Sequence, residues 1–169
     1  AWAAYQRSAL RDAAALQAKS EQEYGDIRRA GLRTPVVLIP NPVAPAPADA
    51  WTADRFRAAF GLEPDCRVVL YLGRIHPVKG VAHLARAWAA LQASHPDWRL
   101  VLAGPDEGGH RAGVERELEA SGCAGRFLFT GMLSDRQKGG AFAAAELFAM
   151  PSRFENFGVA VVEALSAAL

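Results

Sequence analysis

The stretch VVLYLGRIHPVKG, residues 68–80, decides the fold of this chain. Its first five residues form a continuous apolar run, which is typical of a strand buried on both faces of a sheet. A polar loop follows, and from Val81 to Leu91 apolar residues recur at the spacing of one helix face. A buried strand, a polar loop and an amphipathic helix predict a parallel βα unit.

The same pattern repeats along the rest of the chain. Further apolar runs lie at 99–103, 127–130 and 147–150, and helical patterns lie at 54–60, 111–121, 134–145 and from about 158 onward. Strands that alternate with helices predict an α/β fold, a Rossmann-like parallel sheet with helices on both faces. Because ligands bind beyond the carboxyl ends of such strands, we expect the chemistry just after each apolar run.

The first third of the chain has a different character. Residues 1–30 have a helical composition, and residues 35–39 predict a short strand. The run 40–47 contains four prolines in eight residues, which predicts a stiff extended connector and a domain boundary. We therefore expect two domains, 1–48 and 49–169, and expect the second to be truncated, since four strands and a last helix that runs to the final residue make a poor open sheet.

Composition excludes several classes of function. The net charge of +1 gives no reason to expect nucleic-acid binding. No apolar run approaches the roughly 18 residues that a membrane span needs. Cys66 and Cys123 lack metal-ligand spacing, so we expect free thiols in a reducing compartment and a cytoplasmic protein.

The loop after the first strand, 73–80, carries the first candidate site. Gly73 would let the backbone approach a ligand closely. Arg74 at the strand end and Lys79 at the entry to the next helix suit a diphosphate, because a guanidinium fork and a mobile ammonium can both neutralise a leaving phosphate. The alternative is a surface loop with two solvated cations.

The second candidate site is the stretch PSRFENFGVAVVEAL, residues 151–165. Glu155 falls in its loop and Glu163 in a helix that is apolar nearly all round, which predicts a buried helix. A carboxylate there costs several kcal/mol unless it is paired, and sugar or ribose hydroxyls could pair with it. The alternative for Glu163 is a position that reaches solvent, or a Lys or Arg partner. The unpaired N–H groups at Gly158 would also suit an anion.

These two segments, with LAGP at 102–105 and FTGM at 129–132, resemble the C-terminal domain of glycosyltransferase family 4, whose members are retaining enzymes with the two-domain GT-B fold. KSEQE at 19–23 and VLIPNPV at 37–43 resemble the end of the family's N-terminal domain and its interdomain crossing. The resemblance implies a hexosyltransferase-type enzyme that takes a nucleotide-diphosphate sugar and transfers the sugar to a glycan, lipid or small-molecule acceptor. The chain would be the donor-binding part, and by itself we expect it to bind nucleotide weakly and to transfer no sugar.

The resemblance also implies roles for individual residues. Catalytic roles fall to three residues, with Arg74 and Lys79 on the donor diphosphate and Glu155 on the donor sugar. Donor-binding roles fall to Gly73, Met132, Leu133, Asn156, Phe157, Gly158, Val159 and Glu163. Among these, Glu163 would bind the ribose hydroxyls and the backbone near Met132 and Leu133 would line the base. No metal and no other cofactor is expected, because the two cations and a helix N-terminus supply the positive charge.

Two other functions stay open on the sequence. A nucleotide-sugar epimerase shares the two-domain fold and a nucleotide-diphosphate site, and a non-catalytic nucleotide-binding module would need only the binding residues. The Arg74-to-Lys79 spacing and the segment ENFG at 155–158 favour the transferase over the epimerase. Peripheral membrane contact of the whole protein is compatible with each of these functions.

Overall fold

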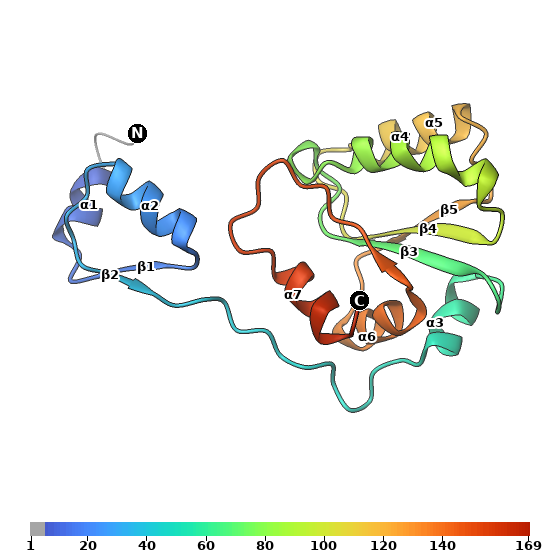
Figure 1. The fold of residues 1–169 in the computed structure, drawn as a ribbon, viewed down its shortest axis with the longest axis horizontal. Helices are drawn as coiled ribbons and strands as arrows, with labels where there is room; N and C mark the ends of the chain where they lie inside the picture. Colours follow the sequence, from blue (N-terminus) through green and yellow to red (C-terminus); the bar gives the residue numbers. More distant parts are fainter. Residues whose placement is uncertain (1–5) are drawn as a thin grey trace. The chain divides into compact units, whose positions relative to one another are not determined.

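The computed structural model describes residues 6–169, which form two compact units (Figure 1). The first unit comprises Ala1–Val43 with Glu155–Val159, and the second comprises Ala44–Phe154 with Ala160–Leu169. The division at Val43 lies within the proline-rich run, where residues 39–47 are neither helix nor strand. The connector thus contains no helix or strand over residues 39–47, and its stiff, extended form and the assignment of domains to 1–48 and 49–169 stay predictions.

The second unit is built on a four-stranded sheet in which every strand is parallel to its neighbours. The strand order is β5-β4-β3-β6. The strands are β3 (Arg67–Leu72), β4 (Trp98–Ala103), β5 (Phe127–Gly131) and β6 (Leu147–Phe148). All four apolar runs are confirmed as strands, and β6 is shorter than its run. Since the strands are parallel, their carboxyl ends meet at one edge of the sheet.

Helices cover both faces of this sheet, as the alternating pattern predicts (Figure 1). The helices are α3 (Ala53–Phe60), α4 (Val81–Leu91), α5 (Arg111–Ala120), α6 (Asp135–Ala144) and α7 (Val159–Ser166). On one face, α3 and α6 pack over β3 and β4, and on the other face α4 and α5 pack over the same strands. The α/β, Rossmann-like fold is therefore confirmed.

The alternation of side chains along β3 divides the core into two clusters. Val68 and Leu70 point into the α3–α6 cluster, whereas Tyr71 points into the α4–α5 cluster. Trp88 of α4 is buried in the second cluster, as its place in the apolar stripe predicts. Leu91 at the end of that stripe is 54% exposed, because α4 ends there and the residue no longer faces the sheet.

The two cysteines are unpaired and buried on opposite faces of the sheet. Cys66 belongs to the α3–α6 cluster and Cys123 to the α4–α5 cluster. Burial raises the pKa of each thiol, because the charged thiolate loses its hydration there. Both thiols are therefore kept in the unreactive protonated form.

Helix α7 corrects one expectation, since the sequence predicted a helix buried all round. Ala160 and Ala164 are buried, but Leu165 is 66% exposed and Val161 is also exposed. Within the second unit, the helix packs on the α3–α6 cluster through Ala164, while Val161 and Leu165 lie outside that contact.

An ion pair ties α7 to α6. The Lys138 ammonium donates to Glu163 Oε1 at 2.9 Å and lies 3.1 Å from Asp135 Oδ1. Burial lowers the pKa of Lys138, but its hydrogen bonds to Glu163 and Asp135 raise the pKa by more, so that it lies above the ordinary lysine value. Glu163 is thus paired with a lysine, which is one of the two alternatives that the sequence left open.

The first unit consists of α1 (Arg7–Asp12), β1 (Leu16–Ala18), α2 (Glu21–Arg29) and β2 (Val36–Leu38). The expectation of one helical stretch over residues 1–30 is wrong for its middle, because β1 separates the two helices, and its first five residues lie outside the described part of the chain. β1 pairs in parallel with β2, and Leu16 N–H donates to the Pro35 carbonyl at 2.8 Å. The β1–β2 ladder thus gives the backbone N–H and carbonyl groups of Leu16–Ala18 hydrogen-bond partners outside a helix.

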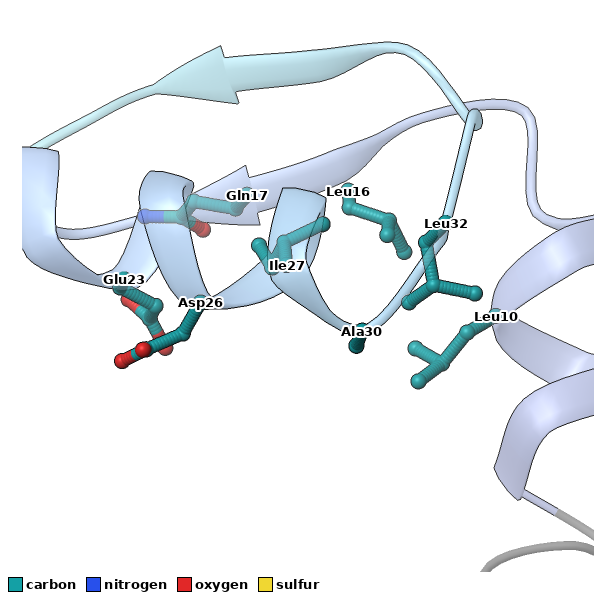
Figure 2. A pocket seen from close by; sticks show the side chains of 8 residues that line it. All are labelled: Leu10, Leu16, Gln17, Glu23, Asp26, Ile27, Ala30 and Leu32. Carbon is teal, nitrogen blue, oxygen red and sulfur yellow. The ribbon is translucent and has the colours of Figure 1, made fainter.

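A pocket of about 420 Å³ lies on the first unit (Figure 2). The apolar part of its lining comes from Leu10, Leu16, Ile27, Ala30 and Leu32. The polar part consists of Gln17 and two carboxylates, Glu23 and Asp26. Figure 2 shows the carboxylates together, away from Leu10 and Leu32. The eight lining residues include two acids and no base, and the carboxylate of Asp26 is ion-paired with Arg29.

In the second unit, the backbone of the loop after β3 lies directly against the backbone of the segment after β6. Gly80 has a left-handed φ of 71°, and a Cβ built on it would lie 1.9 Å from the Pro151 carbonyl oxygen. Glycine is therefore required at this position both by conformation and by space. The contact sets the distance between the two segments that the sequence selected as candidate sites.

We expect Gly80→Ala to lower the free energy of unfolding by about 3 kcal/mol. The left-handed conformation costs a non-glycine residue about 1–2 kcal/mol, and relief of the overlap with Pro151 adds about 1–3 kcal/mol. Urea denaturation of both proteins measures the loss. Gly61→Ala is the matched control, because Gly61 has a φ of 66° with no atom within 4 Å of a built Cβ, and it should lose only the conformational part. Equal losses in the two variants would contradict the close approach.

We expect Lys138→Met to be about 1–3 kcal/mol less stable than the wild type at pH 7, between the values for exposed and buried ion pairs. Because the folded-state pKa of Lys138 is raised, the stability from the pair is complete below the unfolded lysine pKa of about 10.4 and is lost as the pH rises through the folded value. Denaturation at several pH values from 7 to 11 should show the two proteins converging above about pH 10.4.

The control for that series is Arg136→Met. Arg136 lies on the same helix as Lys138, and the substitution removes its exposed ion pair with Asp49. An arginine stays charged throughout this range, so the difference between Arg136→Met and the wild type should not change with pH. A pH-independent deficit in Lys138→Met would show that the ammonium does not stabilise the fold through its charge.

Candidate functional site

The loop that begins at Gly73 is held in place by the strands beside it. Gly73 N–H donates to the Ala103 carbonyl at 2.9 Å, which extends the β3–β4 ladder by one residue. The next carbonyl, that of Arg74, accepts a hydrogen bond of 2.7 Å from the hydroxyl of Tyr71, whose side chain is fully buried. The buried phenol thus fixes the backbone at the position of the predicted phosphate ligand.

The loop after β4 packs directly on this backbone. Ile75 N–H donates to the Pro105 carbonyl at 2.8 Å, and Glu107 N–H donates to the Ile75 carbonyl at 3.3 Å. A Cβ on Gly104 would lie 1.9 Å from the Gly73 carbonyl oxygen, so only glycine allows this approach. The strand ends of β3 and β4 therefore form one rigid platform.

The guanidinium of Arg74 meets a carboxylate that the sequence did not single out. Arg74 Nη1 lies 2.5 Å from Glu107 Oε2, and both side chains are about half exposed. An exposed pair of this kind contributes about 0–1 kcal/mol, so it can exchange for a stronger anion at little cost. No spacing rule in the sequence links Arg74 to Glu107, because their contact depends on the parallel neighbours β3 and β4.

Lys79 ends a short 3₁₀ turn, Pro77–Lys79, before α4, and its side chain is half-buried. His76 caps this turn, since its Nδ1 accepts a hydrogen bond of 3.2 Å from Val78 N–H. This hydrogen bond gives His76 a structural role in holding the turn. The turn places Lys79 five residues from Arg74 on the same loop.

The segment after β6 completes the joint between the two sequence motifs. Arg153 N–H donates to the Val78 carbonyl at 2.9 Å, and the Arg153 guanidinium lies 2.9 Å from His83 Nε2 at the start of α4. Together with the Gly80–Pro151 contact, these bonds hold residues 151–154 against the loop 73–80, called the cationic loop because it carries Arg74 and Lys79. The structure therefore joins two segments about 75 residues apart in sequence, as the strand pattern predicts.

Met132 and Leu133 follow β5 at the same edge of the sheet. Gly104 N–H donates to the Gly131 carbonyl at 2.8 Å, which links this third loop to the platform. Met132 is 79% exposed, whereas Leu133 packs against the α3–α6 cluster. Backbone and the exposed side chain of Met132 are thus accessible at this edge of the sheet.

Glu163 lies in the second unit with Arg74 and Lys79, on the half-buried side of α7. Its Oε1 accepts from Lys138, and no hydrogen bond within residues 6–169 is made by its Oε2. The sequence did not identify Lys138 as the partner of Glu163. An acid on an apolar helix indicates that some cation is needed, but only the packing of α6 on α7 identifies which one.

Five of the predicted site residues belong to the first unit, namely Glu155, Asn156, Phe157, Gly158 and Val159. Within that unit, Asn156 Oδ1 accepts a hydrogen bond of 3.3 Å from the Ser20 hydroxyl, which also caps α2. Gly158 is buried with a φ of 75°, immediately before α7. The donor-binding roles of these five residues stay predictions.

Within residues 6–169, no three His, Cys, Asp or Glu side chains are grouped so that they could hold a metal ion. The same residues contain no helix with the length and apolar character of a membrane span. The loop after β3 and residues 151–154 carry the cations Arg74, Lys79 and Arg153, and the loop after β4 carries the acids Asp106 and Glu107.

Solved structures similar to this chain include a glycosyltransferase and a protein solved in complex with UDP and glucose. The fold matches Anabaena Alr3699/HepE, solved in complex with UDP and glucose, with a TM-score of 0.80 and 25% identity over 95% of this chain and 45% of that one. WaaG, a glycosyltransferase involved in lipopolysaccharide biosynthesis, matches with a TM-score of 0.81 and 21% identity over 99% of this chain and 46% of that one, which supports the fold alone. These neighbours have the GT-B fold, so the predicted fold class is confirmed.

Sequence relatives have the same activity class. The chain is 31% identical to a 2-deoxystreptamine glucosyltransferase of Streptomyces kanamyceticus over 97% of its own length and 43% of that protein. It is 39% identical to a D-inositol 3-phosphate glycosyltransferase of Mycobacterium tuberculosis over 64% of this chain and 22% of that one. The chain thus spans less than half the length of these relatives. Residues 52–169 match the family described as glycosyl transferases group 1, and the chain belongs to that family.

Proposed function

We propose that this chain is the donor-binding part of a retaining glycosyltransferase that takes a nucleotide-diphosphate sugar. The observation that carries the proposal is the platform at the carboxyl edge of the sheet, where Arg74 and Lys79 lie on a loop fixed by Tyr71 and by the Pro151 segment. Family membership supports the transferase class, and the motifs around residues 72–80 and 151–165 favour family 4 within it.

In this proposal the diphosphate binds the cationic loop. Arg74 exchanges its contact with Glu107 for the phosphate oxygens, because a diphosphate carries more charge than one exposed carboxylate. When the bond between the anomeric carbon and the diphosphate oxygen breaks, its electron pair goes to that oxygen. Arg74 and Lys79 then stabilise the departing nucleotide without a metal.

The remaining predicted residues are assigned to the rest of the donor. Glu155 and the backbone N–H groups of residues 156–158 hold the sugar hydroxyls, Glu163 accepts from the ribose hydroxyls, and the backbone at Met132 and Leu133 lines the base. UDP is the first nucleotide to test, because Alr3699/HepE was solved in complex with UDP and with UDP-glucose.

The whole protein would complete the reaction with a further domain. We assign residues 1–48 to the end of that N-terminal domain and 49–169 to the donor-binding domain, and we expect the 169 residues alone to bind nucleotide without transferring sugar. The buried, unpaired thiols of Cys66 and Cys123 fit a reducing compartment, which supports a cytoplasmic location.

We expect Arg74→Ala and Lys79→Ala each to weaken UDP binding about tenfold to a hundredfold, since a charge-assisted hydrogen bond contributes about 1.5–3 kcal/mol. Calorimetric titration of the purified chain with UDP, GDP and ADP measures the effect and selects the base. Arg116→Ala is the matched control, because Arg116 is an exposed arginine on α5 and is not one of the proposed site residues.

Weaker binding in both variants, with an unchanged affinity in Arg116→Ala, would support the diphosphate site. Equal affinity in all four proteins would show that the phosphate does not bind this loop. The same series tests whether the phosphate replaces Glu107 as the partner of Arg74. Glu107→Gln removes the competing carboxylate and should leave the affinity for UDP equal or higher. A loss of affinity in Glu107→Gln would show that this acid assists the site rather than competing with the donor.

A further inference from the structure

The pair between Lys138 and Glu163 has the geometry of a positioning device. Both side chains are largely buried, with 25% and 19% of their surface exposed, and they come from adjacent helices, α6 and α7. Two of the three protons of the ammonium have acceptors, because Asp135 lies at 3.1 Å and Glu163 at 2.9 Å. Asp135 is 82% exposed, so it anchors the ammonium from the solvent side.

The pairing engages one oxygen of Glu163. Lys138 contacts Oε1, while Oε2 makes no hydrogen bond within residues 6–169. A carboxylate that is held at one oxygen keeps one rotamer and presents the other oxygen in a fixed direction. An ionised carboxylate offers both of its oxygens only as hydrogen-bond acceptors.

From this arrangement we infer that Lys138 is a positioning residue for nucleotide recognition, which aims Glu163 Oε2 at the ribose hydroxyls and thereby selects ribonucleotide over deoxyribonucleotide donors. The inference rests on the proposed function, in which Glu163 accepts from the ribose. Lys138 itself touches neither ligand nor reacting atoms. It acts through Glu163, and the loss of its charge leaves Glu163 free to turn.

The competing explanation is that Lys138 only ties α6 to α7. A structural tie would change the stability of the protein and would affect all nucleotides alike. A positioning role would affect only the contact to the ribose, so the two explanations differ in the preference for UDP over 2′-deoxy-UDP. That preference is a ratio of two affinities in the same variant, and partial unfolding cancels from it.

The experiment titrates the 169-residue chain with UDP and 2′-deoxy-UDP, and with the corresponding guanosine and adenosine pairs. The variants are Lys138→Met, Lys138→Arg and Glu163→Gln, with Arg136→Met as a control that removes a neighbouring cation of α6. We expect the wild type and Arg136→Met to prefer the ribonucleotide about tenfold, as the loss of one charge-assisted hydrogen bond predicts.

Lys138→Met should reduce the preference to about twofold while its affinity for the 2′-deoxy nucleotide changes less than about twofold. Glu163→Gln should show the same small preference, and Lys138→Arg should retain most of the wild-type preference. If Lys138→Met does not fold, Lys138→Gln decides instead, and it should lower the preference to about threefold.

A full tenfold preference in Lys138→Met, or in Lys138→Gln where that variant decides, would overturn the inference and leave the proposed function intact. A wild type that binds both nucleotides equally would overturn the role of Glu163, and the inference with it, while the diphosphate site stands. A wild type that binds neither nucleotide would overturn the inference together with the proposed function.

Discussion

The absence of a side chain at Gly80 and at Gly104 is the constraint on which the candidate site depends. At each position a Cβ would lie 1.9 Å from a carbonyl oxygen, that of Pro151 in one case and that of Gly73 in the other. Three loops that follow β3, β4 and β6 can therefore pack backbone against backbone. This packing fixes the backbone that carries Arg74, because the ion pair of Arg74 with Glu107 is exposed and contributes little.

The parallel sheet was predictable because each of its strands is a local signal. The runs 68–72 and 99–103 are short, apolar and bounded by polar residues, and they became the two central strands, β3 and β4. Parallel pairing then places all loops that follow the strands at one edge, so that the positions of Arg74 and Lys79 followed from topology. The strand β1 was missed, because Leu16–Ala18 has no β-branched residue and pairs with a segment about 20 residues away.

The partners of the site residues were not predictable for a different reason. Glu107 contacts Arg74, and Lys138 contacts Glu163, only because of the positions of neighbouring strands and helices along one another. A sequence pattern gives the face of a helix but not its depth on the sheet. The same gap explains α7, where an apolar composition predicted burial all round and the packing buries Ala160 and Ala164 alone among its eight residues.

The two buried cysteines have a consequence for experiments on this fold. Cys66 lies in the layer of α3 and α6, and Cys123 lies in the layer of α4 and α5, so each thiol is shielded by a different half of the core. When a thiol reagent is added during gradual denaturation, the modification rate of each cysteine therefore reports the opening of one layer, and no engineered label is needed. Simultaneous modification would mean that both layers open together, and staggered modification would show which layer of the sheet opens first.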